Sequence, residues 1–99
     1  MSESIRRVLV AYDVSNDARR DRVAVALQSY GERIQYSVFI VDGKPAVFVR
    51  LQVTLRQLID PATDRVLICD LGPKAAAQRR TTFIGQSPSL TGDAASLIV

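Results

Sequence analysis

The stretch VLVAYDVSNDARRDRVAVAL, residues 8 to 27, decides the fold, because it passes from a strand pattern to a helix pattern within a few residues. Apolar and β-branched side chains predict a strand over residues 5 to 14. That run meets an acid, Asp13, and a group of arginines follows shortly after it. A hydrophobic core has no use for either residue type, so the junction points to a functional role.

The helix that follows the junction is predicted over residues 18 to 30, with Asn16 or Asp17 as its cap. Its apolar face is formed by Val23, Leu27 and Tyr30. Gly31 suits the left-handed residue that often ends a helix.

The middle of the chain allows two interpretations. Residues 32 to 41 are extended and predict two short strands with a bend at residues 35 to 37. In residues 42 to 59, an Asp-Gly pair favours a hairpin turn and a further strand. Apolar side chains at helical spacing, with Pro45 suited to a first turn, instead favour a helix over residues 45 to 59, which is the prediction adopted.

The C-terminal part is predicted to add two strands. RVLICDL, residues 65 to 71, is the first, and RRTTFIG, residues 79 to 85, is a short second one that could pair with the sheet edge of a partner chain. Residues 1 to 85 therefore make one domain, and residues 86 to 99 form a tail that is flexible or strand-forming.

The order strand, helix, strand, strand, helix, strand is the ferredoxin-like βαββαβ arrangement, an α+β fold with both helices on one face of an antiparallel sheet. The first strand is apolar on both sides: Val8, Val10 and Tyr12 alternate with Leu9 and Ala11. Two helices cover one face only, so the second face needs a partner. A sheet-to-sheet homodimer is the predicted solution.

Composition excludes several classes of chemistry. The chain of 99 residues has no histidine, which removes histidine-based triads and His-ligated metal sites. Its one cysteine, Cys69, rules out an intrachain disulfide, and its apolar surroundings predict a buried, inert thiol. Neither a signal peptide nor a membrane span is predicted, so a cytoplasmic protein without a membrane partner is expected.

The charge leans towards phosphate-bearing partners. The net charge is +3, and eleven of the thirteen basic residues are arginine. Arginine suits the planar, bidentate contacts of phosphate groups, although an arginine-biased genome explains the same composition equally well.

Two segments carry a resemblance to a known family. VLVAYDVSNDARRDRVAVAL and YGERIQYSVFIVD resemble the CRISPR-associated protein 2 family, and the similarity extends from about residue 7 to residue 85. It implies a ferredoxin-like homodimer that acts in antiviral defence and spacer acquisition. It further implies a magnesium-dependent endonuclease (with manganese as a substitute) that cuts single-stranded RNA or double-stranded DNA. The alternative within the family is a non-cleaving adaptor that bridges two dimers of the adaptation integrase.

The resemblance implies that Asp13 is the catalytic and metal-binding residue. One carboxylate binds magnesium poorly, because the ion gives up its waters reluctantly. Two Asp13 side chains, one from each subunit, would repel each other unless a divalent cation lay between them. Such a metal would polarise a phosphoryl oxygen and activate a water. The alternative is that Asp13 only caps the following turn.

Arginines and two strand residues complete the expected site. Arg19 and Arg20 lie where a helix dipole disfavours cations, so phosphate is the predicted counter-charge, against pairing with Asp17 or Asp21. The resemblance places Ser37 and Phe39 near the same cleft, Ser37 to orient water or phosphate and Phe39 to stack a base. The alternative for both is an ordinary strand.

A second basic patch is expected further along the chain. It is formed by Arg79 and Arg80, with Lys74. No base-reading helix is evident, so binding is expected to follow the nucleic-acid backbone and to weaken with salt.

Overall fold

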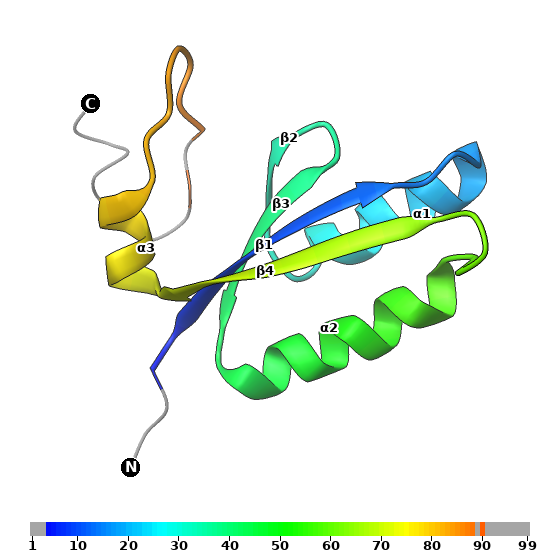
Figure 1. The fold of residues 1–99 in the computed structure, drawn as a ribbon, viewed down its shortest axis with the longest axis horizontal. Helices are drawn as coiled ribbons and strands as arrows, with labels where there is room; N and C mark the ends of the chain where they lie inside the picture. Colours follow the sequence, from blue (N-terminus) through cyan, green and yellow to red (C-terminus); the bar gives the residue numbers. More distant parts are fainter. Residues whose placement is uncertain (1–3, 89, 91–99) are drawn as a thin grey trace.

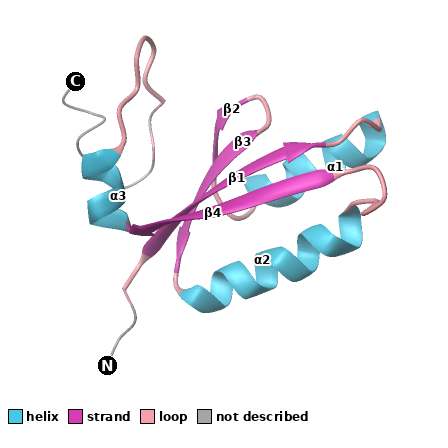
Figure 2. Cartoon of the chain, in the orientation of Figure 1, coloured by secondary structure: helices cyan, strands magenta, loops and turns pink. Residues whose placement is uncertain are grey.

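The computed structural model describes residues 4–88 and residue 90 (Figure 1). Its elements are β1 (Arg6–Asp13), α1 (Asp17–Gln28), β2 (Glu32–Gln35), β3 (Val38–Gly43), α2 (Pro45–Leu58), β4 (Arg65–Pro73) and α3 (Lys74–Arg80). The first six follow the predicted βαββαβ order, and the α+β class is confirmed (Figure 2). Among the described residues no helix is long and apolar enough to cross a bilayer.

The four strands form one antiparallel sheet in the order β2-β3-β1-β4, as the ferredoxin-like arrangement requires (Figure 1). Val8, Val10 and Tyr12 project from one face of β1 into the core. They meet α1 through Val23 and Leu27 and α2 through Leu51 and Leu55. Since both helices pack on the residues of one face, the predicted layering is confirmed.

The start of α1 is fixed by a side-chain cap. Asn16 accepts a hydrogen bond from the backbone N–H of Arg19 at 2.9 Å, which satisfies a donor that the helix leaves unpaired. The predicted cap is therefore Asn16, and Asp17 is the first helical residue.

The prediction that Gly31 ends α1 as a left-handed residue is wrong. The helix cap is Ser29, and Gly31 does not have a positive φ. A Cβ at this position would lie 2.1 Å from the carbonyl oxygen of Ile40, so the glycine is needed because the chain after α1 runs directly against β3.

The ambiguous middle segment is a helix. Pro45 occupies its first turn, and Leu51 and Leu55 are buried one turn apart. The helix ends at Leu58 and its cap Ile59 is extended, one residue earlier than predicted. The bend predicted between the two short strands is also confirmed, because β2 ends at Gln35 and β3 begins at Val38.

The second face of the sheet is apolar at one end. Leu9 pairs with Cys69, and Ala11 pairs with Leu67, whose side chain is 56% exposed. Cys69 is exposed as well, so the prediction of a buried thiol is wrong for the single chain. The error comes from β4, a strand at the sheet edge whose outer face no described element covers. The predicted homodimer would cover this face, and it stays a prediction.

The predicted C-terminal strand is wrong for its first residues. Lys74–Arg80 form the helix α3, which buries Ala77, and Arg79 and Arg80 end it. Three consecutive alanines with high helix propensity explain why the chain turns helical here. Thr81 is extended, and residues 81 to 88 pair with no strand of the described chain. Pairing with a partner chain stays a prediction, and most of the predicted tail, residues 89 and 91 to 99, lies outside the described residues.

Candidate nucleic-acid interface and acidic site

Asp13 is the last residue of β1, where its side chain is exposed. It stands opposite Arg65 in the pairing of β1 with β4 and follows Ala11 on the open face of the sheet. Within the described part of the chain its carboxylate makes no hydrogen bond or ion pair. Because no backbone N–H of the described chain donates to this carboxylate, the alternative that Asp13 caps the next turn is not supported, and the side chain that caps α1 is Asn16.

The turn between β2 and β3 lies beside this end of β1. The backbone N–H of Tyr12 donates to the carbonyl of Ser37 at 3.1 Å, and the Tyr12 hydroxyl donates to the carbonyl of Tyr36 at 3.4 Å. Ser37 is half-buried next to the strand that ends in Asp13. The structure thus brings Asp13 and Ser37 to the same end of the sheet.

Phe39 is brought to the core. Its side chain is 0% exposed, and its ring stacks on Tyr12 with 6.3 Å between centroids. A base has no access to this ring in the folded chain, so the structure favours the ordinary-strand alternative for Phe39. Tyr12 is a packing residue, as its alternation with Asp13 predicted.

Arg19 is engaged in an internal ion pair. Its Nε donates to Oδ2 of Asp64 at 2.8 Å and its Nη2 to Oδ1 at 3.2 Å. The bond to Asp64 raises the pKa of Arg19. The predicted alternative partners, Asp17 and Asp21, are wrong, because the partner lies 45 residues away in the sequence.

Asp64 is held ionised by the residues around it. The Arg19 guanidinium, then the backbone N–H of Asp60, and also the Thr63 hydroxyl lower the pKa of Asp64 from 3.8 to about 2, against the opposing effect of burial. With its charge committed in this way, Arg19 is poorly placed to hold a phosphate.

Arg20 is bonded to the chain directly after Asp13, at the carbonyl of Val14. It pairs with Asp17 and donates to the carbonyl of Val14 at 3.1 Å, and the bond to Asp17 raises its pKa. The alternative of a pair with Asp17 is thus confirmed for Arg20. Asp17 is almost fully exposed, so this pair is solvated and a phosphate can compete for the guanidinium.

The second basic patch is at the other end of β1. The backbone N–H of Lys74 donates to the carbonyl of Ile5 at 2.9 Å, which puts α3 roughly 25 Å from Asp13 by the rise of a strand. Arg79 and Arg80 are exposed there, and Arg80 donates to the carbonyl of Ala76. Lys74 pairs with Asp42 at 3.5 Å, which removes it from the patch.

Sequence reasoning missed two residues of the hairpin, Arg33 and Tyr36. The Arg33 guanidinium carbon lies 5.8 Å from the Tyr36 ring centroid and 5.2 Å from that of Phe39. The signal was available in part, because pairing the two predicted strands across their bend sets Arg33 opposite Phe39. The exposure of Tyr36 depends on the turn geometry, which the sequence does not specify.

The described residues do not form a metal site within one chain. They contain no group of three or more acidic or thiol side chains that could surround an ion. A lone exposed carboxylate fits magnesium only as one half of a shared site, since the ion keeps several waters and needs few protein ligands.

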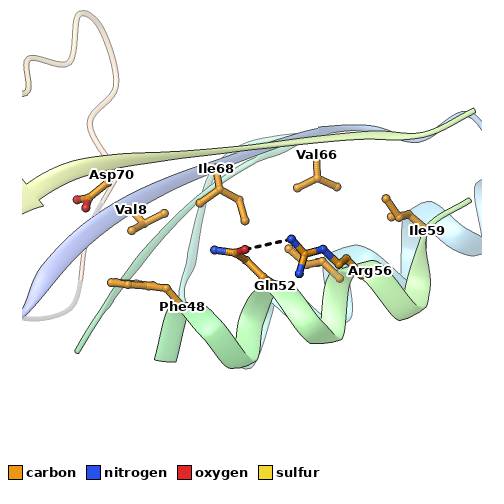
Figure 3. A pocket seen from close by; sticks show the side chains of 9 residues that line it. Val8, Phe48, Gln52, Arg56, Ile59, Val66, Ile68 and Asp70 are labelled. Atoms are coloured by element: carbon orange, nitrogen blue, oxygen red, sulfur yellow. Dashed lines mark hydrogen bonds between the residues drawn. The ribbon is translucent and has the colours of Figure 1, made fainter. Parts of the chain in front are cut away.

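A groove of about 530 Å³ lies elsewhere, between α2 and β4 (Figure 3). Phe48 of α2 and its cap residue Ile59 face Val66 and Ile68 of β4 across it. Gln52 accepts a hydrogen bond from Arg56 at its centre. The groove involves none of the side chains predicted for the site.

The fold and these residues define a small ferredoxin-like α+β protein with an acid and arginines at one end of its sheet. Residues 6–79 match the family described as "CRISPR associated protein Cas2", and the chain belongs to this Cas2 family.

Individual relatives agree with this assignment. A protein of Rhodospirillum rubrum named "CRISPR-associated endoribonuclease Cas2 3" is 42% identical over 88 residues, covering 84% of this chain and 90% of the relative. The crystal structure of Streptococcus pyogenes Cas2 at pH 6.5 superposes with a TM-score of 0.70 at 38% identity, covering 80% of this chain and 99% of the other. A chain of a partial Cas6-RT-Cas1–Cas2 complex has a TM-score of 0.66 at 26% identity, covering 85% and 95%.

Proposed function

We propose that this chain is a magnesium-dependent endonuclease of CRISPR adaptation, in which Asp13 of two subunits holds the metal. The observation that carries the proposal is the state of Asp13. It is an exposed carboxylate at a strand end with no partner in the described chain, and no local structural role explains it. Manganese suits the same oxygen ligand.

The apolar open face supports a second copy as the source of the missing ligand. Ala11, Leu67 and Leu9 lie on the face that Asp13 also occupies. Burying these side chains against the same face of a second chain would remove apolar surface from water. A two-fold axis near Asp13 would then bring its twin to the same place.

The residues around Asp13 have distinct tasks in this proposal. When bound, magnesium polarises a phosphoryl oxygen and lowers the pKa of a water, which supplies a nucleophile in a protein without histidine. The Ser37 hydroxyl donates a hydrogen bond to that water or to the phosphate. Arg20 exchanges its solvated partner Asp17 for a phosphate oxygen and positions the backbone.

The substrate class follows from charge and from the relatives. Exposed arginines without a base-reading helix support binding of the phosphate backbone rather than a sequence. The name of the Rhodospirillum rubrum relative, an endoribonuclease, supports single-stranded RNA as a substrate. Double-stranded DNA is the second substrate to be tested.

A second function, that of an architectural adaptor, is favoured by a different observation. The similarity to a chain of a complex whose name includes Cas1 and Cas2 supports assembly with an integrase. Arg79 and Arg80 are exposed far from Asp13, where they can hold duplex DNA without taking part in cleavage. Such an adaptor binds DNA in a salt-dependent way and does not cut it.

An Asp13→Asn variant separates the two functions, with Asp21→Asn as a matched control on an exposed acid of α1. Cleavage of labelled single-stranded RNA and of duplex DNA is followed in magnesium, and binding of both is measured in EDTA. Asp13→Asn is expected to abolish cutting while dimerisation and binding persist, and Asp21→Asn to cut normally. Cutting that survives Asp13→Asn contradicts the nuclease mechanism. If the wild type binds duplex DNA in a salt-sensitive way and cuts neither substrate, the result supports the adaptor function instead of the nuclease.

A further inference from the structure

One aromatic side chain near Asp13 is left open to solvent. Tyr36, in the turn between β2 and β3, is 70% exposed, whereas Tyr12 and Phe39 nearby are buried. The Tyr36 ring is therefore the aromatic surface at this end of the sheet that is accessible to a ligand, in a chain with six aromatic residues among 99.

The backbone beneath this ring is held in place. The Tyr36 carbonyl accepts a hydrogen bond from the Tyr12 hydroxyl, and the next carbonyl, that of Ser37, accepts one from the Tyr12 backbone. Two successive carbonyls of the turn are thus both bonded to Tyr12 of β1. A ligand that meets the ring meets a surface already ordered, which lowers the entropic cost of binding.

Two arginines flank the Tyr36 ring. The Arg33 guanidinium lies 5.8 Å from the ring centroid and also donates to the Tyr12 hydroxyl at 3.5 Å. Arg20 lies beside the Tyr36 hydroxyl, and its Nε is buried without a hydrogen-bond partner in the described chain. The Arg33 guanidinium lies over the Tyr36 ring at cation–π distance, and the 70% exposure of Tyr36 leaves most of the side chain open to solvent.

We propose that Tyr36 stacks an unpaired nucleobase, while Arg20 and Arg33 hold the phosphates on either side of it. An exposed aromatic face between two cations matches the way proteins bind single strands, by base stacking together with backbone neutralisation. A paired base in a duplex is already stacked on its neighbours and does not offer its face. The arrangement therefore selects single-stranded nucleic acid.

This inference rests on the proposed nucleic-acid function and refines it. It replaces Phe39, which the fold buries, with Tyr36 as the stacking residue of the same end of the sheet. It also separates the tasks of the site, since Tyr36 acts on the base and Asp13 on the phosphodiester.

The test measures binding of a fluorescent single-stranded oligonucleotide of uniform sequence by anisotropy, in EDTA so that no cutting occurs. Wild type, Tyr36→Ala and Tyr36→Phe are compared, with Val53→Ala, an exposed apolar residue of α2, as control. The same strand with abasic sites and a duplex of equal length are the reference ligands. Thermal unfolding verifies that each variant is folded.

Tyr36→Ala is expected to weaken binding of the base-bearing strand by about tenfold, while Tyr36→Phe and Val53→Ala bind like the wild type. The abasic strand and the duplex are expected to bind wild type and Tyr36→Ala equally. Equal affinity of wild type and Tyr36→Ala for the base-bearing strand overturns the stacking role alone, since cleavage that depends on Asp13 would persist. A wild type that binds no oligonucleotide overturns both this inference and the proposed function.

Discussion

Arg19 Nε donates to Oδ2 of Asp64 across 2.8 Å, and the Asp64 side chain is completely buried. Asp64 also accepts a hydrogen bond of 2.8 Å from the backbone N–H of Asp60. The pair joins the first turn of α1 to the loop between α2 and β4, so it fixes the elements that frame the acidic end of the sheet. Its role is structural, so of the two arginines predicted to contact phosphate, Arg20 is the one whose ion pair is solvated.

The first prediction concerns the pH dependence of stability. The pKa of Asp64 is lowered to about 2 in the folded chain from 3.8, so its contribution is complete above pH 4 and is lost as the pH falls towards 2. Melting temperatures of wild type and Asp64→Asn, measured from pH 7 to pH 2, should differ most near neutral pH and converge in acid. Asp21→Asn, an exposed acid, serves as control. A difference between wild type and Asp64→Asn that stays constant over this range would contradict the assignment.

The second prediction separates Arg19 from Arg20. Arg19→Gln leaves a buried carboxylate without its cation, so it should lower the melting temperature by several degrees. Arg20→Gln should leave the melting temperature nearly unchanged and weaken nucleic-acid binding, with the salt slope of log K reduced by about 1. Arg50→Gln, the same charge change on an exposed residue of α2, is the control for both measurements. The assignment fails if Arg19→Gln weakens binding without any loss of stability.

The fold could be predicted largely because its signals are local. The apolar side chains that alternate in residues 8 to 12, and those at helical spacing around Leu51, are the same side chains that form the core. Errors arose where a long-range contact decides. The partner of Arg19 is 45 residues away. The burial of Phe39 depends on the register of β3, in which a shift of one residue exchanges the faces, and the exposure of Tyr36 depends on the geometry of the turn. Asp13 stands out in the sequence because it ends an apolar strand, and its role as the acid of the site stays a prediction.

The third prediction addresses Gly31. The methyl carbon there would meet the carbonyl oxygen of Ile40 at 2.1 Å, and because that carbonyl is backbone and the methyl group has no rotamer that avoids it, β3 or the chain before it must move. Gly31→Ala should lower the free energy of unfolding by about 1–3 kcal/mol, as overpacking does. Urea denaturation measures the loss, and Gln28→Ala, on an exposed residue at the end of α1, is the control. A variant as stable as the wild type would mean that the chain after α1 does not press against β3.

The fourth prediction tests the homodimer. Leu67 is exposed on the apolar open face of the single chain, so Leu67→Glu should place a charge in the proposed interface and yield a monomer. Sedimentation equilibrium measures the state, and Val49→Glu, an exposed apolar residue of α2, should remain dimeric. The thiol of Cys69, on the same strand, should react slowly with a thiol reagent in the wild type and rapidly in Leu67→Glu. A wild type that is monomeric at micromolar concentration contradicts the shared site at Asp13.

The last prediction concerns the two ends of the sheet. Arg79 and Arg80 lie on α3, about 25 Å from Asp13 along β1, so a short single strand that occupies the acidic end does not reach them. A double variant, Arg79→Gln with Arg80→Gln, should weaken binding of duplex DNA and reduce the salt slope by about 2, because two phosphate contacts are lost. Cleavage of a short single-stranded RNA should stay within about twofold of the wild type, since stacking and backbone contacts at the acidic end supply its binding. Arg50→Gln combined with Arg56→Gln, on α2, removes the same charge and should leave duplex binding intact. If the α3 variant instead stops cleavage of the short strand while duplex binding is unchanged, the two basic patches act as one site.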